Sequence, residues 1–179
     1  MSKNIPKTLI IHHTGGTDLD PLADTSHHTF EIVDGYHKSL GWGKIGYHYF
    51  IDRTGKVTQG RKDDEEGAHT KGQNLTSLGI CLAGNFDATM PTQEQVSALK
   101  TLLKEKLTQY AIPASNVVPH RKYASKTCFG RKLSDTWAQD LLKEAPAPVP
   151  VPTVPSNDSI RDDIRKKLAE VDVLLSKIR

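Results

Sequence analysis

The sequence is poor in cysteine and has no long apolar run, and each shortage excludes a class of protein. Its 179 residues include two cysteines, Cys81 and Cys128, which are too few for a disulfide-stabilised scaffold. No apolar stretch approaches the roughly 20 residues that a membrane-spanning helix needs, so we expect no membrane span. Residues 1–7 lack the apolar core of a signal peptide, which predicts synthesis in the cytoplasm. That reducing compartment favours two free thiols over a disulfide.

Net charge is also low. The formal net charge is +3 at pH 7, and charged residues make up 25% of the chain. This mild positive excess suits an anionic polymer as partner, but it is too small to indicate nucleic acid. Apolar residues make up 36% of the chain, which is enough for the core of one modest globular domain.

The composition changes sharply at residue 145, where the sequence reads APAPVPVPTVP. Such a proline-rich stretch favours extended polyproline II structure and acts as a semi-rigid spacer. We therefore expect a main domain at 1–144, a linker at 145–157 and a C-terminal amphipathic helix at 158–179. The apolar residues of that helix follow the spacing of a coiled-coil seam, which favours a homo-oligomer or docking on a partner. They are Ile164, Leu168, Val171, Leu175 and Ile178.

The main domain alternates predicted strands and helices. Thr92 and Gln95 form a capping box, which predicts the start of the clearest helix. Strands are predicted at Thr8–His13, Tyr47–Asp52, Lys56–Gln59, Leu78–Ala83 and Asn116–Pro119, and helices at Phe30–Leu40, Val96–Tyr110 and around Trp137. This order predicts an α/β fold in which a central mixed β-sheet is flanked by helices.

Two histidines and a cysteine are candidate metal ligands. His12 and His13 end the first predicted strand, and because strand side chains alternate, at most one of them points at a given site. His120 and Cys128 lie in one predicted loop, HRKYASKTC. A catalytic zinc ion takes three protein ligands and leaves one position open for water. One histidine of the pair, with His120 and Cys128, would supply that set.

Other interpretations of these residues stay open at this point. A buried histidine or cysteine more often packs than binds a metal. Two histidines and a cysteine also describe a blue-copper site with an axial methionine, but no methionine follows Cys128. His27, His28 and His37 are predicted to lie on a helix and are expected at its surface. Cys81 lies inside an apolar strand and is expected to pack in the core.

Four segments, in order, carry a resemblance to a known family. They are IIHHT, IGYHYF, GAHTKGQNLTSLGICLAGNFD and HRKYASKTC, and they span about residues 8–142. Together they resemble the type 2 N-acetylmuramoyl-L-alanine amidases, the superfamily that includes phage lysozyme-amidases and peptidoglycan recognition proteins. The resemblance implies the fold of that superfamily and hydrolysis of the amide bond between N-acetylmuramic acid and L-alanine in bacterial peptidoglycan. A non-catalytic peptidoglycan-binding recognition module is the alternative within the same superfamily.

The resemblance also implies a site. It implies one zinc ion per chain, held by His12, His120 and Cys128. The interval between the second histidine and the cysteine resembles that of the phage enzymes and places Lys126 at their catalytic lysine. Tyr47, in the segment IGYHYF, matches their catalytic tyrosine.

Two further residues and one departure complete the comparison with the family. His69 and Asn74 fall in a segment that resembles a substrate-contacting loop, so the resemblance implies substrate binding for both. Phe129 and Gly130 follow the cysteine, where many members have proline and a small residue, so we expect a different cleft wall there. The polar N-terminus fits a phage endolysin, which is made in the cytoplasm and acts on the cell wall after release, in the host periplasm.

Overall fold

The computed structural model describes residues 3–17, 19–143 and 167. The predicted linker at 145–157 and the predicted helix at 158–179 lie outside these residues, apart from Lys167, so both stay predictions, as does the homo-oligomer. The chain divides into two units, Met1–Ala145 and Pro146–Arg179, and the first contains the fold described below. Within the described residues, no helix combines the length and the apolar character that crossing a membrane requires.

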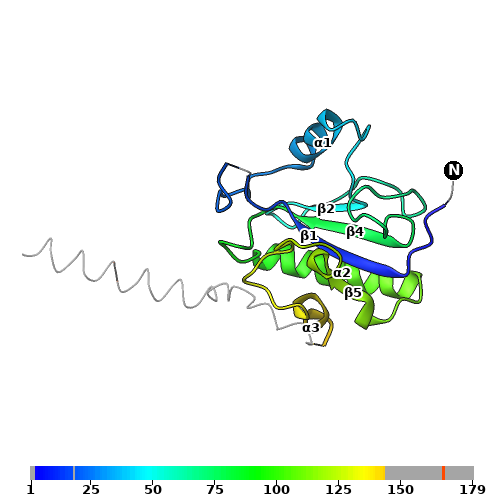
Figure 1. The fold of residues 1–179 in the computed structure, drawn as a ribbon. Helices are drawn as coiled ribbons and strands as arrows, with labels where there is room; N and C mark the ends of the chain where they lie inside the picture. Colours follow the sequence, from blue (N-terminus) through cyan, green and yellow to red (C-terminus); the bar gives the residue numbers. More distant parts are fainter. Residues whose placement is uncertain (1–2, 18, 144–166, 168–179) are drawn as a thin grey trace, which may run out of the picture. The chain divides into compact units, whose positions relative to one another are not determined.

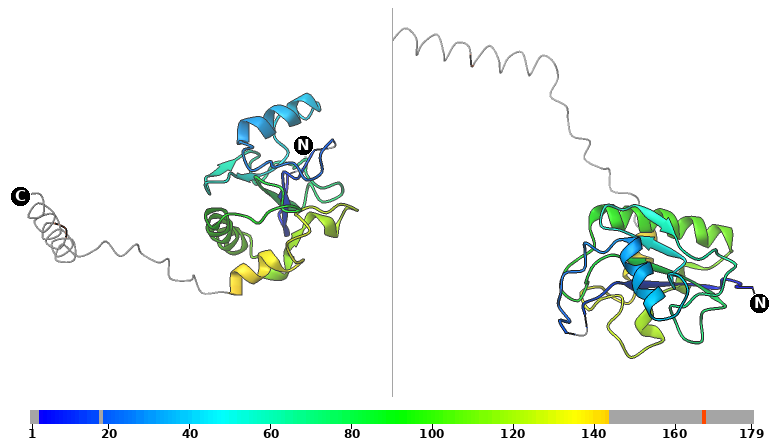
Figure 2. Two further views of the ribbon diagram at one scale, coloured as in Figure 1. Left: turned by 90° about the vertical axis from the view of Figure 1, so that its left-hand side faces the viewer. Right: turned by 90° about the horizontal axis from the view of Figure 1, so that it is seen from above.

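The fold is a mixed five-stranded sheet in the order β3-β2-β4-β1-β5, with helices on both faces (Figures 1 and 2). The elements are β1 (Thr8–His13), α1 (Phe30–Ser39), β2 (Tyr49–Ile51), β3 (Val57–Gln59), β4 (Ser77–Leu82), α2 (Gln93–Gln109), the 3₁₀ helix η1 (Ala114–Asn116), β5 (Val117–Pro119), the 3₁₀ helix η2 (His120–Lys122) and α3 (Trp137–Lys143). Helix α1 covers one face, and α2 and α3 cover the other (Figure 2). The predicted α/β architecture is confirmed.

Most predicted elements occur where the sequence indicates them. Strand β1 has the predicted bounds, and Thr92 and Gln95 make the reciprocal hydrogen bonds of a capping box at the start of α2. Strand β2 begins two residues later than the predicted strand Tyr47–Asp52, because the backbone hydrogen bonds of Tyr47 and His48 do not follow the regular pattern of a strand. Tyr47 accepts a hydrogen bond from the Arg61 N–H, whereas His48 pairs with Gly79 and with the residue after β3.

Strand β1 lies at the centre of the sheet and pairs in parallel with both β4 and β5. Parallel strands that are covered on both faces are apolar throughout, and every residue of β4 is buried. Leu9 and Ile11 belong to the core formed with α2 and α3. Because side chains alternate along a strand, His12 points to the opposite face, on the side of α1.

Asp63 joins the loop after β3 to α2 through buried polar contacts. Its carboxylate accepts hydrogen bonds from the hydroxyls of Tyr49 at 2.6 Å and Tyr110 at 2.8 Å. Lys106 Nζ lies 3.1 Å from the same carboxylate, and the two side chains are 8% and 13% exposed. Burial alone would raise the pKa of Asp63, but these hydrogen bonds and the lysine charge outweigh burial and lower it. The contacts therefore depend on an ionised carboxylate.

Replacing Asp63 with asparagine should destabilise the fold by about 2 kcal/mol at neutral pH. Removing one partner of a buried ion pair typically costs about 3–5 kcal/mol, and the loss is smaller here because Glu105 also contacts Lys106 at 2.9 Å. Folding lowers the pKa of Asp63. The native protein is therefore more stable to unfolding than Asp63→Asn above the ordinary carboxyl pKa of about 3.9, and this difference in stability is lost as the pH falls below that value. Urea unfolding of both proteins across this pH range measures the difference.

Asp64→Asn is the matched control for that experiment. Asp64 pairs with Lys3 at the surface, where the two side chains are 56% and 80% exposed. This substitution should change the free energy of unfolding by less than about 0.5 kcal/mol. If the difference between the native protein and Asp63→Asn stayed constant across the pH range, the charge of Asp63 would not be its source.

Candidate metal centre

His12, His120 and Cys128 converge on one point beside the carboxyl ends of β1 and β5. One ligand atom from each residue lies within 4.8 Å of the other two. His12 Nδ1 is 3.8 Å from Cys128 Sγ, and the ring centroids of His12 and His120 are 4.4 Å apart. His120 and Cys128 lie 108 and 116 positions after His12 in the sequence, and the fold brings them next to it.

His13 takes no part in this cluster. Its ring points to the face of the sheet that α2 and α3 cover, where Nδ1 accepts a hydrogen bond from the Phe86 N–H at 3.0 Å. Burial lowers the pKa of His13 to about 4, so the ring is neutral and can accept this bond at neutral pH. Because side chains alternate along β1, His12 and not His13 is the candidate metal ligand.

The spacing of the His12 and Cys128 donor atoms fits a tetrahedral zinc ion. Zinc–nitrogen and zinc–sulfur bonds of about 2.1 and about 2.3 Å at tetrahedral angles separate the two ligand atoms by about 3.6 Å, close to the 3.8 Å between His12 and Cys128. Burial lowers the pKa of His12 and His120, which keeps both imidazoles in the neutral form that binds metals. Burial also raises the pKa of the Cys128 thiol to about 12. A bound dication would supply the charge that a buried thiolate needs.

Arg121 shapes the loop that carries Cys128. Its backbone N–H donates to the Cys128 carbonyl at 2.7 Å. Its guanidinium donates to the carbonyls of Gly130 and Leu133, each at 2.7 Å. The planar guanidinium of arginine suits such a task because it presents several donors in fixed directions.

Asp87 holds the same loop from the other side. Its carboxylate accepts hydrogen bonds from the Thr127 hydroxyl and the Arg131 N–H, each at 2.7 Å. Phe129 points away from the cleft, is 1% exposed and packs against Trp137 with ring centroids 5.6 Å apart. Neither Phe129 nor Gly130 lines the cleft, so a cleft wall that differs from that of other members stays a prediction.

The donors open onto a cleft of about 610 Å³. Tyr47 and Lys126 both line it, and the Tyr47 ring centroid is 5.1 Å from that of His12. Burial raises the pKa of Tyr47 well above its ordinary value, so its hydroxyl stays protonated. Lys126 is exposed at the cleft, so its ammonium group is free to approach a bound molecule. Trp42 also lines the cleft and is 42% exposed.

His69 and Asn74 lie next to one another beside the cluster. His69 Nδ1 is 3.1 Å from His12 Nε2, so the ring contacts a candidate ligand directly. The Asn74 side chain accepts hydrogen bonds from the backbone N–H groups of His69 at 3.0 Å and Thr70 at 2.9 Å. Asn74 lines a second hollow of about 520 Å³, which shares His69 and Lys126 with the cleft. Substrate contact by either residue stays a prediction.

Two residues of the opposite wall were not predicted from the sequence. His37 is 6% exposed rather than at the surface, and its Nδ1 accepts a hydrogen bond from the Gly46 N–H at 2.9 Å. Its spacing of four from buried Val33 is the signal that places both residues on one face of α1. His27 and His28 precede α1 instead of lying on it.

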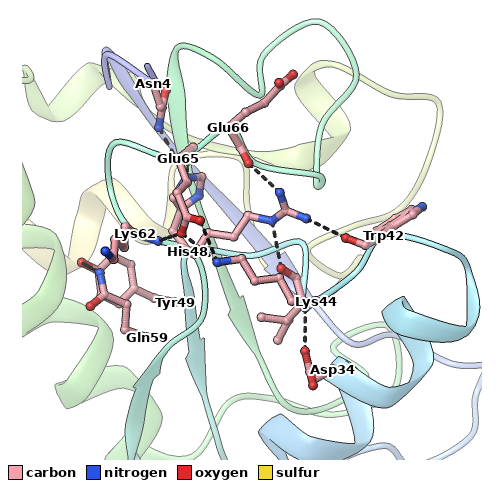
Figure 3. A network of polar contacts seen from close by, with 12 residues as sticks. Asn4, Asp34, Trp42, Lys44, His48, Tyr49, Gln59, Lys62, Glu65 and Glu66 are labelled. Atoms are coloured by element: carbon pink, nitrogen blue, oxygen red, sulfur yellow. Dashed lines mark hydrogen bonds and ion pairs between the residues drawn. The ribbon is translucent and has the colours of Figure 1, made fainter. Parts of the chain in front are cut away.

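Arg61 is the second residue, and it holds the chain segment that precedes Tyr47. Its guanidinium donates to the carbonyls of Ile45 at 2.9 Å and Glu66 at 2.8 Å. Figure 3 shows the surrounding network, in which the Lys44 ammonium contacts Glu65 at 2.8 Å. No periodic pattern marks Arg61, since its partners are backbone carbonyls of loop residues that lie 5, 16 and 19 positions away.

Comparison with known proteins identifies the family. A profile described as N-acetylmuramoyl-L-alanine amidase matches residues 2–134. An endolysin of Klebsiella phage KP32 is 38% identical over 112 residues, which cover 60% of this chain and 73% of that protein. The solved structure of the N-acetylmuramoyl-L-alanine amidase LysC from Clostridium intestinale is similar with a TM-score of 0.68 and 26% identity, covering 79% of this chain and 88% of LysC.

A structure from the recognition branch of the superfamily is similar as well. Bumblebee PGRP-SA matches with a TM-score of 0.65 and 28% identity, covering 83% of this chain and 90% of that one. Both cysteines of the present chain are free, as the sequence predicts. Because the profile spans nearly all of the described fold, the chain belongs to the N-acetylmuramoyl-L-alanine amidase family and is an enzyme of that class.

Proposed function

We propose that this enzyme holds one zinc ion between His12, His120 and Cys128 and uses it to cut peptidoglycan. The bond cut is the amide between N-acetylmuramic acid and L-alanine, the reaction that gives the family its name. The observation that carries the proposal is the convergence of two neutral imidazoles and a thiol within 4.8 Å at an open cleft. Zinc bound by such a set supplies a Lewis acid with one position free for water.

Two side chains of the cleft act on the substrate in this proposal. Lys126 offers a positive charge to the carbonyl oxygen, which becomes negative when the amide is attacked, and stabilising that charge is usually the largest catalytic contribution. Tyr47 offers a hydroxyl that burial keeps protonated, and it orients the attacking water or the substrate by a hydrogen bond. The cleft has room for the junction of sugar and peptide. His69 is proposed to contact that junction from the wall that the cleft and the second hollow share, and Asn74 from the second hollow.

The biological role follows from the relatives. The phage protein reported above is named an endolysin. We infer that the present enzyme is also an endolysin, made in the cytoplasm and acting on the bacterial cell wall after release. Three filled donor positions favour catalysis over a recognition module that only binds the wall.

Metal removal should abolish hydrolysis. A protein treated with a chelator should release no stem peptide from purified cell walls, and stoichiometric zinc should restore release, because the open position for water depends on the metal. Cys128→Ser should lose both bound zinc and activity, since a hydroxyl is a much poorer ligand than a thiolate. Metal content by mass spectrometry and peptide release by chromatography measure the two effects.

If the zinc-loaded protein sedimented with cell walls but released no stem peptide, the result would support a recognition module that only binds the wall. Full release by the metal-free protein would reject the zinc mechanism. Cys81→Ser is the control for metal content, because Cys81 is fully buried in β4 and is not one of the three donors, so this variant should keep its zinc. Its activity is not compared, because the Cys81 side chain hydrogen-bonds Tyr47.

Removing the charge of Lys126 should slow the reaction without loss of metal. Lys126→Met should lower kcat by about 10²–10³-fold, the range found when one donor to a developing oxyanion is removed. Tyr47→Phe should lower kcat while leaving the fold intact, because it removes one hydroxyl. Both variants should keep one zinc per chain. Steady-state hydrolysis of a muropeptide, with metal analysis of each variant, makes the measurement.

Lys122→Met is the matched control for Lys126→Met. Lys122 lies on the same loop, is exposed and contacts the Tyr123 ring, with Nζ 5.9 Å from the ring centroid. It does not line the cleft. Equal losses of activity in the two lysine variants would point to the general charge of the loop and not to a role of Lys126 at the reacting bond.

A further inference from the structure

The ring of His12 has two nitrogens, and only one faces the metal donors. Nδ1 points to Cys128 Sγ, whereas Nε2 lies 3.1 Å from His69 Nδ1. We infer that His69 is a positioning residue that fixes the proton of His12 on Nε2 and so keeps Nδ1 free to bind the metal. The inference rests on the proposed zinc site, and it gives His69 a role other than substrate contact.

Two proton arrangements satisfy the contact between the rings. In the first, His12 Nε2 carries the proton and donates it to His69 Nδ1, which leaves a lone pair on His12 Nδ1. In the second, His69 donates, and the proton of His12 sits on Nδ1, where it blocks metal binding. Only the first is compatible with a metal ligand, and a ligating histidine generally donates its other N–H in this way. The Thr70 hydroxyl lies 3.0 Å from His69 Nδ1 and 3.4 Å from His12 Nε2, and because a hydroxyl both donates and accepts, it is compatible with this arrangement.

Two glycines make the space for the His69 ring. A Cβ atom at Gly79, in β4, would lie 2.5 Å from His69 Cγ. A Cβ atom at Gly67 would lie 2.5 Å from His69 Cδ2. Glycine weakens a strand interior and often marks a close approach of other atoms. The ring thus lies directly against the backbone of β4, and Asn74 fixes the backbone of its loop through two hydrogen bonds.

The other nitrogen of His69 argues against a merely structural role. His69 Nε2 is buried and has no hydrogen-bond partner among the residues that the structure describes. An unpaired buried polar atom is unfavourable, and an apolar side chain of similar shape would avoid it. The first proton arrangement places the proton of His69 on this nitrogen. An imidazole at position 69 is therefore explained by the hydrogen bond that its Nδ1 accepts from His12 Nε2.

A pair of substitutions distinguishes the effect of the hydrogen-bond acceptor on His69 from the effect of the space that its ring fills. His69→Leu fills the space but offers no acceptor, whereas His69→Asn places an amide oxygen near the position of Nδ1. His69→Leu should weaken zinc binding by about 10–100-fold, the usual effect of removing such a partner, and His69→Asn should restore most of the affinity. Competition with a coloured chelator measures the zinc Kd of each full-length protein. His27→Leu, at an exposed site, is the control and should leave the Kd unchanged.

A second measurement needs neither a variant nor a metal. Long-range ¹H–¹⁵N spectra of the zinc-free native protein report which nitrogen of His12 carries the proton, and we expect Nε2. A proton on Nδ1, or a Kd for His69→Leu equal to that of the native protein, would overturn the inference. If the native protein bound no zinc, the proposed function would fail, yet the spectra would still decide how His12 and His69 share the proton.

Discussion

The register of β1 between β4 and β5 is the constraint on which the site depends. In this register His12 lies opposite Cys81, and Ile11 lies opposite Pro119, the last residue before His120. A shift by one residue would exchange the two faces of the strand, turning His12 toward α2 and α3 and His13 toward α1. The apolar residues of β1 prevent that shift because Leu9 and Ile11 are fully buried against α2 and α3. Core packing on one face thus specifies the metal donors on the other.

Loops supply the remaining groups of the site, and two arginines give these loops a defined shape. Arg121 binds carbonyls of the segment that contains Cys128. Arg61 binds carbonyls on the wall that contains Tyr47. Arg121 also pairs with the Asp135 carboxylate, but both arginines hold their loops through several backbone acceptors. A loop held in this way can vary in sequence while it keeps a ligand or a hydroxyl in place.

The parts of the fold that the sequence predicts are those with a local signal. Strand β1 and the capping box of α2 follow from short patterns of apolar residues and of hydrogen-bonding side chains. The choice of His12 over His13 does not follow from spacing, because alternation says only that the two differ; it needed either the family resemblance or the core contacts of β1. The burial of His37 has a local signal in its spacing from Val33, whereas the contact of His69 with His12 joins residues 57 positions apart, which no local pattern encodes.

The burial of Cys128 has a consequence for the handling of the protein. Thiols are oxidised and alkylated as thiolates, and a raised pKa keeps a thiol in its unreactive form. Cys128 has a pKa of about 12, and burial raises that of Cys81 as well. An enzyme that works on a cell wall meets a more oxidising environment than the cytoplasm. The raised thiol pKa of both cysteines therefore slows oxidation and alkylation of their sulfurs while no metal is bound.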